Sequence, residues 1–217
     1  MMATYEYSDE LIIKARRKME EAQKESHSSE VVQQEIQQSI YDNIVTIFEV
    51  PVVFKDWDII ENRATIRMPS DFVARTDEEI ASVYVLGTKP QYVYSNGYLG
   101  FMIAFNWTTN LISNDNIHDF TQFASRAIER TGPQCRILNT EKLNRPDCNL
   151  AILQFLAQTL DSVNMNVMFF ASIEGRLLIG SITFNQKDAN RLRPLAVEIA
   201  KSFHLNSTEE EQVNEHN

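Results

Sequence analysis

Side chains that could act as metal ligands or nucleophiles are few in this 217-residue chain, which has four histidines and two cysteines. No histidine lies at ligand spacing from another, so His118 beside Asp119 is expected to be a solvated residue near a helix start. Cys148 with His118 could be imagined as a nucleophile and its base. The sequence supplies neither a third, orienting group nor a helix N-terminus to lower the thiol pKa. We therefore expect no metal and no cysteine nucleophile.

Two groups of charged side chains also have an explanation other than catalysis. The run Asp77-Glu78-Glu79 is typical of the first turn of a helix, where carboxylates interact favourably with the helix dipole. Arg191 and Arg193 beside Arg126 and Arg130 could form a small basic spot, but a solvated face is the simpler interpretation. Neither group predicts an active site.

Motifs that mark common catalytic or cofactor sites are missing from the sequence. It contains no GxGxxG, no phosphate-binding loop ending in Gly-Lys-Ser/Thr, no HExxH and no CxxC. Gly180-Ser181 lies inside an apparent strand and lacks the second glycine of a nucleophile elbow. We therefore expect a protein that is not an enzyme and binds no cofactor.

An aromatic stretch, GTKPQYVYSNGYLGFMIAFNW from Gly87 to Trp107, raises the question of a ligand pocket. Pro90 suits the start of a strand because it cannot supply a ladder N–H. Asn96-Gly97 is the strongest short signal for a hairpin turn. Beyond Gly100, alternate residues from Phe101 to Trp107 fall on one face, as on the inward side of a sheet. The aromatics are therefore expected to be core.

The net charge of −10 is concentrated at the two ends of the chain. Residues 1–42 hold nine acids and five bases, residues 206–217 hold four acids and no base, and the part between them is nearly neutral. Phosphate binding requires a concentrated basic face, so nucleic acid is not an expected partner.

The sequence also predicts where the protein resides. Its first residues mix acids with bases and contain no apolar stretch of signal-peptide length. No apolar run is long enough to cross a bilayer. Two cysteines, Cys135 and Cys148, suggest reduced thiols rather than a disulfide framework. We expect a cytoplasmic protein without membrane attachment.

Residues 8–41 are predicted to be helical, as one bent helix or two short ones. Their composition, rich in Gln, Glu and Lys and free of Gly and Pro, differs from that of the rest of the chain. The predicted domains are a helical extension at 1–42, a body at 43–205 and a disordered acidic tail at 206–217. The apolar stripe of the extension consists of Leu11, Ile12, Met19, Val32, Ile36 and Ile40.

The body alternates apolar and polar residues in many short segments, which indicates strands. Strands are expected at 44–50, 64–68, 135–140, 150–158, 165–173 and 176–184, with a tight turn at Glu174-Gly175. Thr76 and Glu79 predict a capping box, Ser113–Thr131 an amphipathic helix, and Leu192 to Phe203 a closing helix with Pro194 in its first turn. Consecutive strands with two strong helices indicate an α+β fold with an antiparallel sheet. One core is predicted from Phe101, Phe105, Trp107, Phe120, Phe169 and Phe203.

The segments IRMPSDF, GTKPQYVYSN, GFMIAFNW and LLIGSITFNQKDANRLRPLAVEIAKSFHL resemble the PsbP/Mog-type superfamily in pattern and order. The resemblance covers about Val45 to Leu205. It implies an α/β/α sandwich around a central antiparallel sheet, in a group that mostly works by binding, including an accessory subunit of the photosynthetic oxygen-evolving complex. The helical extension departs from that pattern, and no partner-binding residue is carried over.

The expected function is a non-enzymatic protein-interaction or scaffolding module. The alternative is an enzyme or small-ligand binder that uses a cleft between the sheet and the helix Ser113–Thr131. The apolar stripe of the extension is expected to dock on a protein partner or on another copy, or to pack on its own body.

Overall fold

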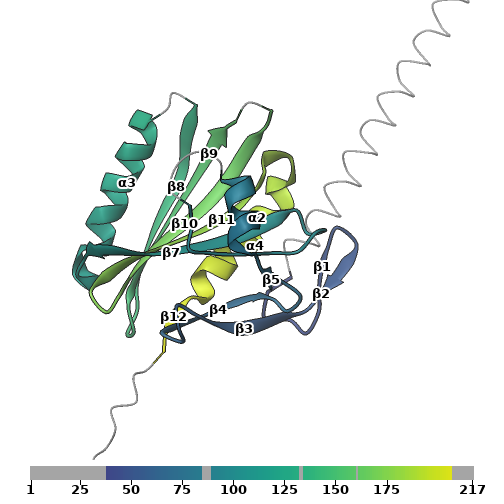
Figure 1. Cartoon of the computed structure of the whole chain (residues 1–217), viewed down its shortest axis with the longest axis horizontal. Coiled ribbons are helices and arrows are strands. Elements are labelled where there is room, and N and C mark those ends of the chain that lie inside the picture. The colour runs from purple at the N-terminus through teal and green to yellow at the C-terminus, as the bar shows by residue number, and fades with distance from the viewer. Residues whose placement is uncertain (1–37, 85–88, 132–133, 160, 207–217) are drawn as a thin grey trace, which may run out of the picture. The chain divides into compact units, whose positions relative to one another are not determined.

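The computed structural model describes residues 38–84, 89–131, 134–159 and 161–206 (Figure 1). It divides the chain into two compact units, Met1–Gln38 and Ser39–Asn217, and every element below belongs to the second. The division falls slightly earlier than the expected boundary at Asp42-Asn43. The predicted helical extension and acidic tail lie almost entirely outside the described residues.

Three α-helices and twelve strands make up the described part of the chain. The helices are α2 (Asp77–Val83), α3 (Ile117–Thr131) and α4 (Ala189–Ser202), and single 3₁₀ turns, η1 (Asn114–Asn116) and η2 (Gln186–Asp188), precede α3 and α4. The strands are β1 (Val45–Ile47), β2 (Val50–Val52), β3 (Phe54–Ile59), β4 (Ala64–Pro69), β5 (Val73–Ala74), β6 (Tyr92–Ser95), β7 (Phe101–Leu111), β8 (Cys135–Asn144), β9 (Asn149–Gln158), β10 (Val163–Ile173), β11 (Arg176–Asn185) and β12 (His204–Leu205).

The strands form one large antiparallel sheet and two small ones. The large sheet has seven strands in the order β5-β6-β7-β11-β10-β9-β8. The second sheet, β12-β4-β3, has three strands, and β1 and β2 form a separate hairpin. The prediction of an α+β fold with an antiparallel sheet is confirmed.

The two faces of the seven-stranded sheet bury different side chains, because successive strand residues point to opposite sides. Phe169 of β10 packs with α4, and its ring centroid lies 5.7 Å from that of Phe203. Phe170, the next residue, packs with Phe120 of α3 at 5.3 Å on the other face. Helix α4 also contacts β4, so the three-stranded sheet shares its side of the large sheet (Figure 1).

Phe120 corrects the prediction of a single aromatic core. Five of the six predicted residues do share the larger cluster, but Phe120 belongs to the cluster under α3. The sequence shows that Phe120 faces inward on its helix, but not on which face of the sheet that helix lies.

The capping prediction for α2 is confirmed. The Thr76 Oγ1 accepts a hydrogen bond from the Glu79 N–H at 3.3 Å, and the Glu79 Oε2 accepts one from the Thr76 N–H at 2.8 Å. These reciprocal bonds satisfy donors that a helix start leaves free. They begin α2 at Asp77 and fix its direction over the sheet.

Two local predictions are corrected by the structure. Residues 44–50, expected as one strand, contain a turn at Phe48 and Glu49, both of which have positive φ. Pro194 is the sixth residue of α4 rather than part of its first turn. The helix starts early because the Asn185 side chain caps the preceding 3₁₀ turn by accepting from the Lys187 N–H.

Candidate functional site

The aromatic hairpin of β6 and β7 presents its large rings to the core, as predicted. Phe101 and Phe105 are buried, and the Phe105 ring meets those of Tyr94 and Phe169 at centroid distances of 6.0 and 6.2 Å. These edge-on contacts are the preferred geometry for aromatic pairs. This face of the hairpin is therefore packing and not a ligand site.

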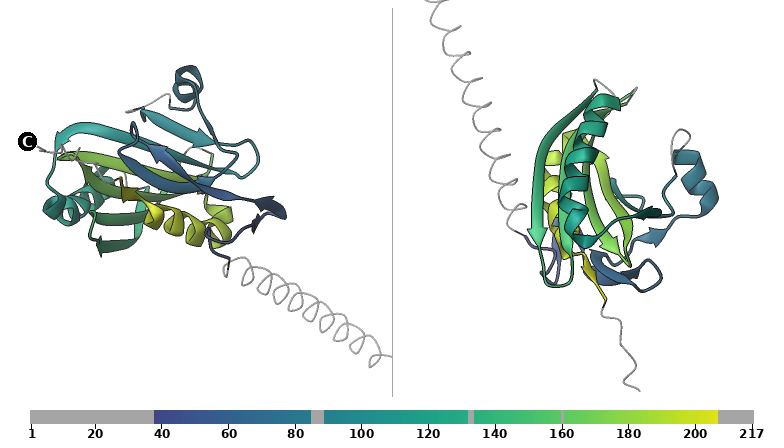
Figure 2. Two further views of the ribbon diagram at one scale, coloured as in Figure 1. Left: turned by 90° about the horizontal axis from the view of Figure 1, so that it is seen from below. Right: turned by 90° about the vertical axis from the view of Figure 1, so that its left-hand side faces the viewer.

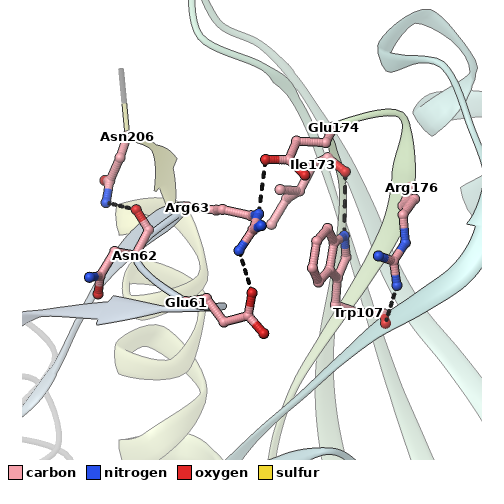
Figure 3. Close-up of polar contacts among 8 residues, drawn as sticks. All are labelled: Glu61, Asn62, Arg63, Trp107, Ile173, Glu174, Arg176 and Asn206. Carbon is pink, nitrogen blue, oxygen red and sulfur yellow. Dashed lines mark hydrogen bonds and ion pairs between the residues drawn. The ribbon is translucent and has the colours of Figure 1, made fainter. Parts of the chain in front are cut away.

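Trp107, near the end of β7, is held between two arginines (Figure 3). The guanidinium carbons of Arg176 and Arg63 lie 3.8 and 4.8 Å from its ring centroid. The indole N–H donates to the carbonyl of Ile173 at 3.3 Å, and Arg176 donates to the carbonyl of Trp107. The contact between Arg63, next to β4, and Trp107 of β7 joins the two sheets. Because its ring faces and its N–H are occupied, Trp107 is not free to bind a ligand.

The loop between β3 and β4 supplies Arg63 and receives the end of the body (Figure 3). Arg63 pairs with Glu61 at 2.6 Å and with Glu174 at 2.9 Å, and these two carboxylates raise the pKa of Arg63. Asn206 donates to the carbonyl of Asn62 at 2.8 Å. Asn206, expected to begin the tail, therefore belongs to the body.

The opposite face of the hairpin contains a cavity of about 480 Å³ under α2. Such a volume is within the range of about 300–1,000 Å³ that is usual for ligand pockets. Its apolar wall comes from the small cluster of Ile80, Val93 and Met102, which packs α2 on β6 and β7. This cavity lies under α2, whereas the alternative function expected a cleft between the sheet and α3, which packs on β8, β9 and β10.

Few polar groups converge on this cavity, and most of them bond to each other. Arg75 donates to the Ser95 Oγ at 2.7 Å and to the Glu79 Oε1 at 3.1 Å. The hydrogen bond from the Thr76 N–H and the contact with Arg75 lower the pKa of Glu79. The Tyr84 hydroxyl donates a weak hydrogen bond to the thioether of Met102, at 3.6 Å, and burial raises the pKa of Tyr84. Among the described residues that line the cavity, no free acid and base are arranged for proton transfer.

Large apolar side chains are exposed around the cavity. Val83, which lines it, is 61% exposed, and Tyr98 lies in the loop whose residues Asn96 and Gly97 form its edge. Val73 is paired with Ser95, another lining residue, so both point to the same face. We call Val73, Val83 and Tyr98 the apolar rim.

The hollow continues along the same face of the sheet beyond Tyr84. A second cavity of about 180 Å³, also lined by Tyr84, extends over Asn106, Ile179 and Ser181. Together the two cavities follow β7 from Phe101 to Asn106, about 17 Å of extended chain. Helices α2 and α3 lie apart in Figure 2. We call the hollow that the two cavities form the α2 groove.

The cysteine and histidine candidates do not form a site. Cys148 is buried in the cluster on the α4 side, where burial and the neighbouring Asp147 raise the pKa of the thiol to about 12. His118 belongs to α3 on the other face, and its buried Nε2 has no hydrogen-bond partner among the described residues. Cys135 pairs with Ala157 at the far end of the β8–β9 ladder from Cys148, so the cysteines are too far apart for a disulfide.

The remaining charged candidates are dispersed as expected. Arg126 lies on α3, whereas Arg191 and Arg193 lie on α4 across the sheet, so no common basic spot forms. Arg193 donates to the Gln154 Oε1 at 2.7 Å, and Arg191 lies over the Phe48 ring at 5.5 Å. Within the described ranges, no three His, Cys, Asp or Glu residues are grouped to hold a metal ion. None of the helices described there could span a bilayer.

Ile40 is the one residue of the predicted docking stripe that the structure describes, and it packs inside the body. It is fully buried in the main core, and its N–H donates to the Glu198 Oε2 at 3.1 Å. A partner cannot reach it there. The other five stripe residues, Leu11, Ile12, Met19, Val32 and Ile36, lie outside the described residues.

The rim residues were not singled out from the sequence. Val73, Val83 and Tyr98 are single apolar residues beside turns, a pattern common on any surface. They become recognisable only when the β5–β6 register and the direction of α2 bring them to one cavity.

Comparisons with known proteins identify the fold. No family model matches the chain, and no curated protein matches it. The solution structure of cyanobacterial PsbP (CyanoP) from Synechocystis is similar to it with a TM-score of 0.54 and 13% identity, over 70% of this chain and 92% of CyanoP. LpqN of Mycobacterium tuberculosis, involved in cell envelope biogenesis, gives 0.45 at 10% identity, with 74% of this chain and 95% of LpqN covered. PA94 of Pseudomonas aeruginosa, a protein of unknown function, gives 0.42 at 12%, with 71% of this chain and 99% of PA94 covered.

The likeness to CyanoP establishes a PsbP-like fold for this chain. The PsbP part of the expected resemblance is thereby supported. The identity is too low to transfer a function or a residue role, which have to be argued from the site itself.

Proposed function

We propose that this chain is a non-enzymatic, cytoplasmic protein-interaction or accessory module that binds protein through the α2 groove and its apolar rim. The supporting observation is the coincidence of a cavity of about 480 Å³ with exposed Val73, Val83 and Tyr98. Exposed apolar side chains gathered at a concave site are typical of protein-binding surfaces. An accessory role also agrees with what the PsbP/Mog resemblance implies.

The chemistry of the described groups also favours binding over catalysis. The thiol of Cys148, with a pKa of about 12, is protonated at neutral pH and cannot act as a nucleophile. At the groove, Arg75 and Glu79 neutralise each other through their ion pair. An active site would instead need an acid or base with a pKa moved toward neutrality.

Replacing Val83 by Asp in the tagged full chain tests whether the groove binds protein. Val83 is exposed, so the fold should be unaffected, but a charge in the apolar rim should remove partners that co-purify with the wild type. Phe123→Asp is the matched control, because Phe123 is 67% exposed on α3, away from the groove. Equal partner levels in wild type and Val83→Asp, by quantitative mass spectrometry, would contradict the proposal.

The same cavity supports a second candidate, a small-ligand binder or enzyme. Arg75 and Tyr84 give it two polar groups above an apolar wall, which would suit an amphipathic molecule. Native mass spectrometry of the purified chain distinguishes the two. A bound metabolite that Val83→Asp releases would replace the protein-binding proposal with this one.

A further inference from the structure

The surroundings of the α2 groove are acidic as well as apolar. Asp77 and Glu78 are exposed on the first turn of α2, next to the lining residue Glu79. Asp71 accepts hydrogen bonds from Asn96, another lining residue, and from the Tyr98 hydroxyl. Asp71, Asp77 and Glu78 make no ion pair within the described part of the chain, so they give the surroundings of the groove a net negative charge.

Basic residues around the groove do not cancel this charge. Arg75 is already paired with Glu79 at 3.1 Å. Lys89, the one other base in the neighbouring described sequence, lies beside Pro90 at the far cavity. The end of the groove under α2 is therefore an apolar hollow with a negative edge. Its complement is an apolar side chain flanked by positive charges.

The chain itself contains a segment of that chemistry. Residues 11–19, LIIKARRKM, have apolar residues at both ends and four bases between them, Lys14, Arg16, Arg17 and Lys18, with no acid. In the helix expected there, Lys14 lies three residues after the stripe residue Leu11, and Lys18 lies four residues after Lys14, so both bases border the apolar stripe. Acids flank residues 11–19 at positions 9–10 and 20–21. The charge complementary to the groove is therefore confined to residues 11–19.

We propose that residues 11–19 of one copy occupy the α2 groove of a second copy, with Leu11, Ile12 or Met19 in the cavity and the bases facing Asp71, Asp77 and Glu78. This inference rests on the proposed function, since it takes the α2 groove to be a protein-binding surface. We take the occupant to be a second copy because Ile40, the first stripe residue that the structure describes, packs on the face of the sheet opposite the groove. Ile40 packs in the α4-side core, whereas the groove residues Val93 and Met102 are on the other side.

Self-association of the purified full chain tests the inference. Sedimentation over a range of concentrations should reveal a dimer that weakens as salt is raised, because the matching charges are screened. Lys14→Glu with Lys18→Glu in one variant, or Asp77→Lys with Glu78→Lys in another, should each raise the dimer dissociation constant at least about tenfold. Equimolar mixing of these two variants should restore association, because each segment now faces a groove of opposite charge.

Matched variants separate this surface from others. Val83→Asp should weaken the dimer, whereas Val53→Asp, at a similarly exposed valine between β2 and β3, should not. Arg126→Glu with Arg130→Glu makes the same charge change on α3 and should leave the dimer intact.

Three outcomes would overturn the inference. These are a monomer at all concentrations, a dimer insensitive to both charge variants, and a mixture of the two variants that fails to associate. A monomer whose Asp77→Lys/Glu78→Lys variant alters amide exchange within residues 11–19 would assign the groove to the same copy instead. The proposed function survives each of these results if Val83→Asp still removes a co-purifying protein. Failure of the dimer inference can therefore be told apart from failure of the proposed protein-binding function.

Discussion

Gly180 illustrates how one residue position is fixed by a neighbouring ring. It is paired with Phe169, and a Cβ added at Gly180 would lie 2.1 Å from the Phe169 Cζ. The Phe105 and Phe203 rings enclose Phe169 and limit its movement. Gly180→Ala should therefore destabilise the protein by about 1–3 kcal/mol in chemical denaturation. Gly97→Ala, where a Cβ meets nothing within 4 Å, should change stability by less than about 0.5 kcal/mol, and equal effects would contradict this packing.

A second prediction for a single residue concerns how the stability and the reactivity of the Cys148 thiol depend on pH. Its pKa rises from 9.0 to about 12 in the fold, first through burial and then through Asp147. The unfolded chain therefore releases this proton at lower pH than the native state, so the thiol's contribution to stability is lost between about pH 9 and 12. Native protein at pH 8 should react with a thiol reagent quickly only at Cys135, and unfolded protein at both cysteines. Rapid reaction of two thiols in native protein would show that Cys148 is accessible.

In the β1–β2 hairpin, the turn has a backbone conformation that its residues, Phe48 and Glu49, rarely adopt. Glu49 has φ of 66° and is exposed, a conformation that costs an L-residue about 1–2 kcal/mol and glycine very little. Glu49→Gly should raise the free energy of unfolding by up to about 1 kcal/mol. The control Glu78→Gly, in the helical backbone of α2, should lower it by a similar amount. A loss of stability in Glu49→Gly would mean that the turn is not as described.

Elements were predictable where side-chain type and backbone conformation agree. The capping residues of α2, the stripe of α3 and the alternation of β9, β10 and β11 were each readable from the sequence. The β1–β2 turn was missed because Phe48 and Glu49 are not turn residues. At Asn96-Gly97 the hairpin was found, but the positive φ is at Gly100, and the Asn96 side chain instead accepts from the Leu99 N–H.

The arrangement of the whole molecule depends on pairings between distant parts of the chain, which local patterns do not encode. The placement of β11 between β7 and β10, and the opposite faces taken by α3 and α4, determine which aromatics share a core. The α2 groove was unpredictable for the same reason. Its apolar rim joins residues from β5, α2 and the β6–β7 loop, and no single segment identifies them.

The junction between the two units of the chain provides the last prediction. Ser39 donates to the Glu198 Oε1 at 2.5 Å, Ile40 is fully buried, and Arg67 donates to the Ile40 carbonyl at 2.8 Å. Deleting residues 1–37 should abolish the dimer and, at concentrations where the full chain is monomeric, leave the thermal unfolding midpoint of the body unchanged. Deleting residues 1–42 should in addition cost about 3–5 kcal/mol, because it removes the Ile40 side chain from the core and leaves Glu198 without its partners. Equal stability of the two truncated proteins, measured at the same concentration by calorimetry, would place the domain boundary at Asp42 after all.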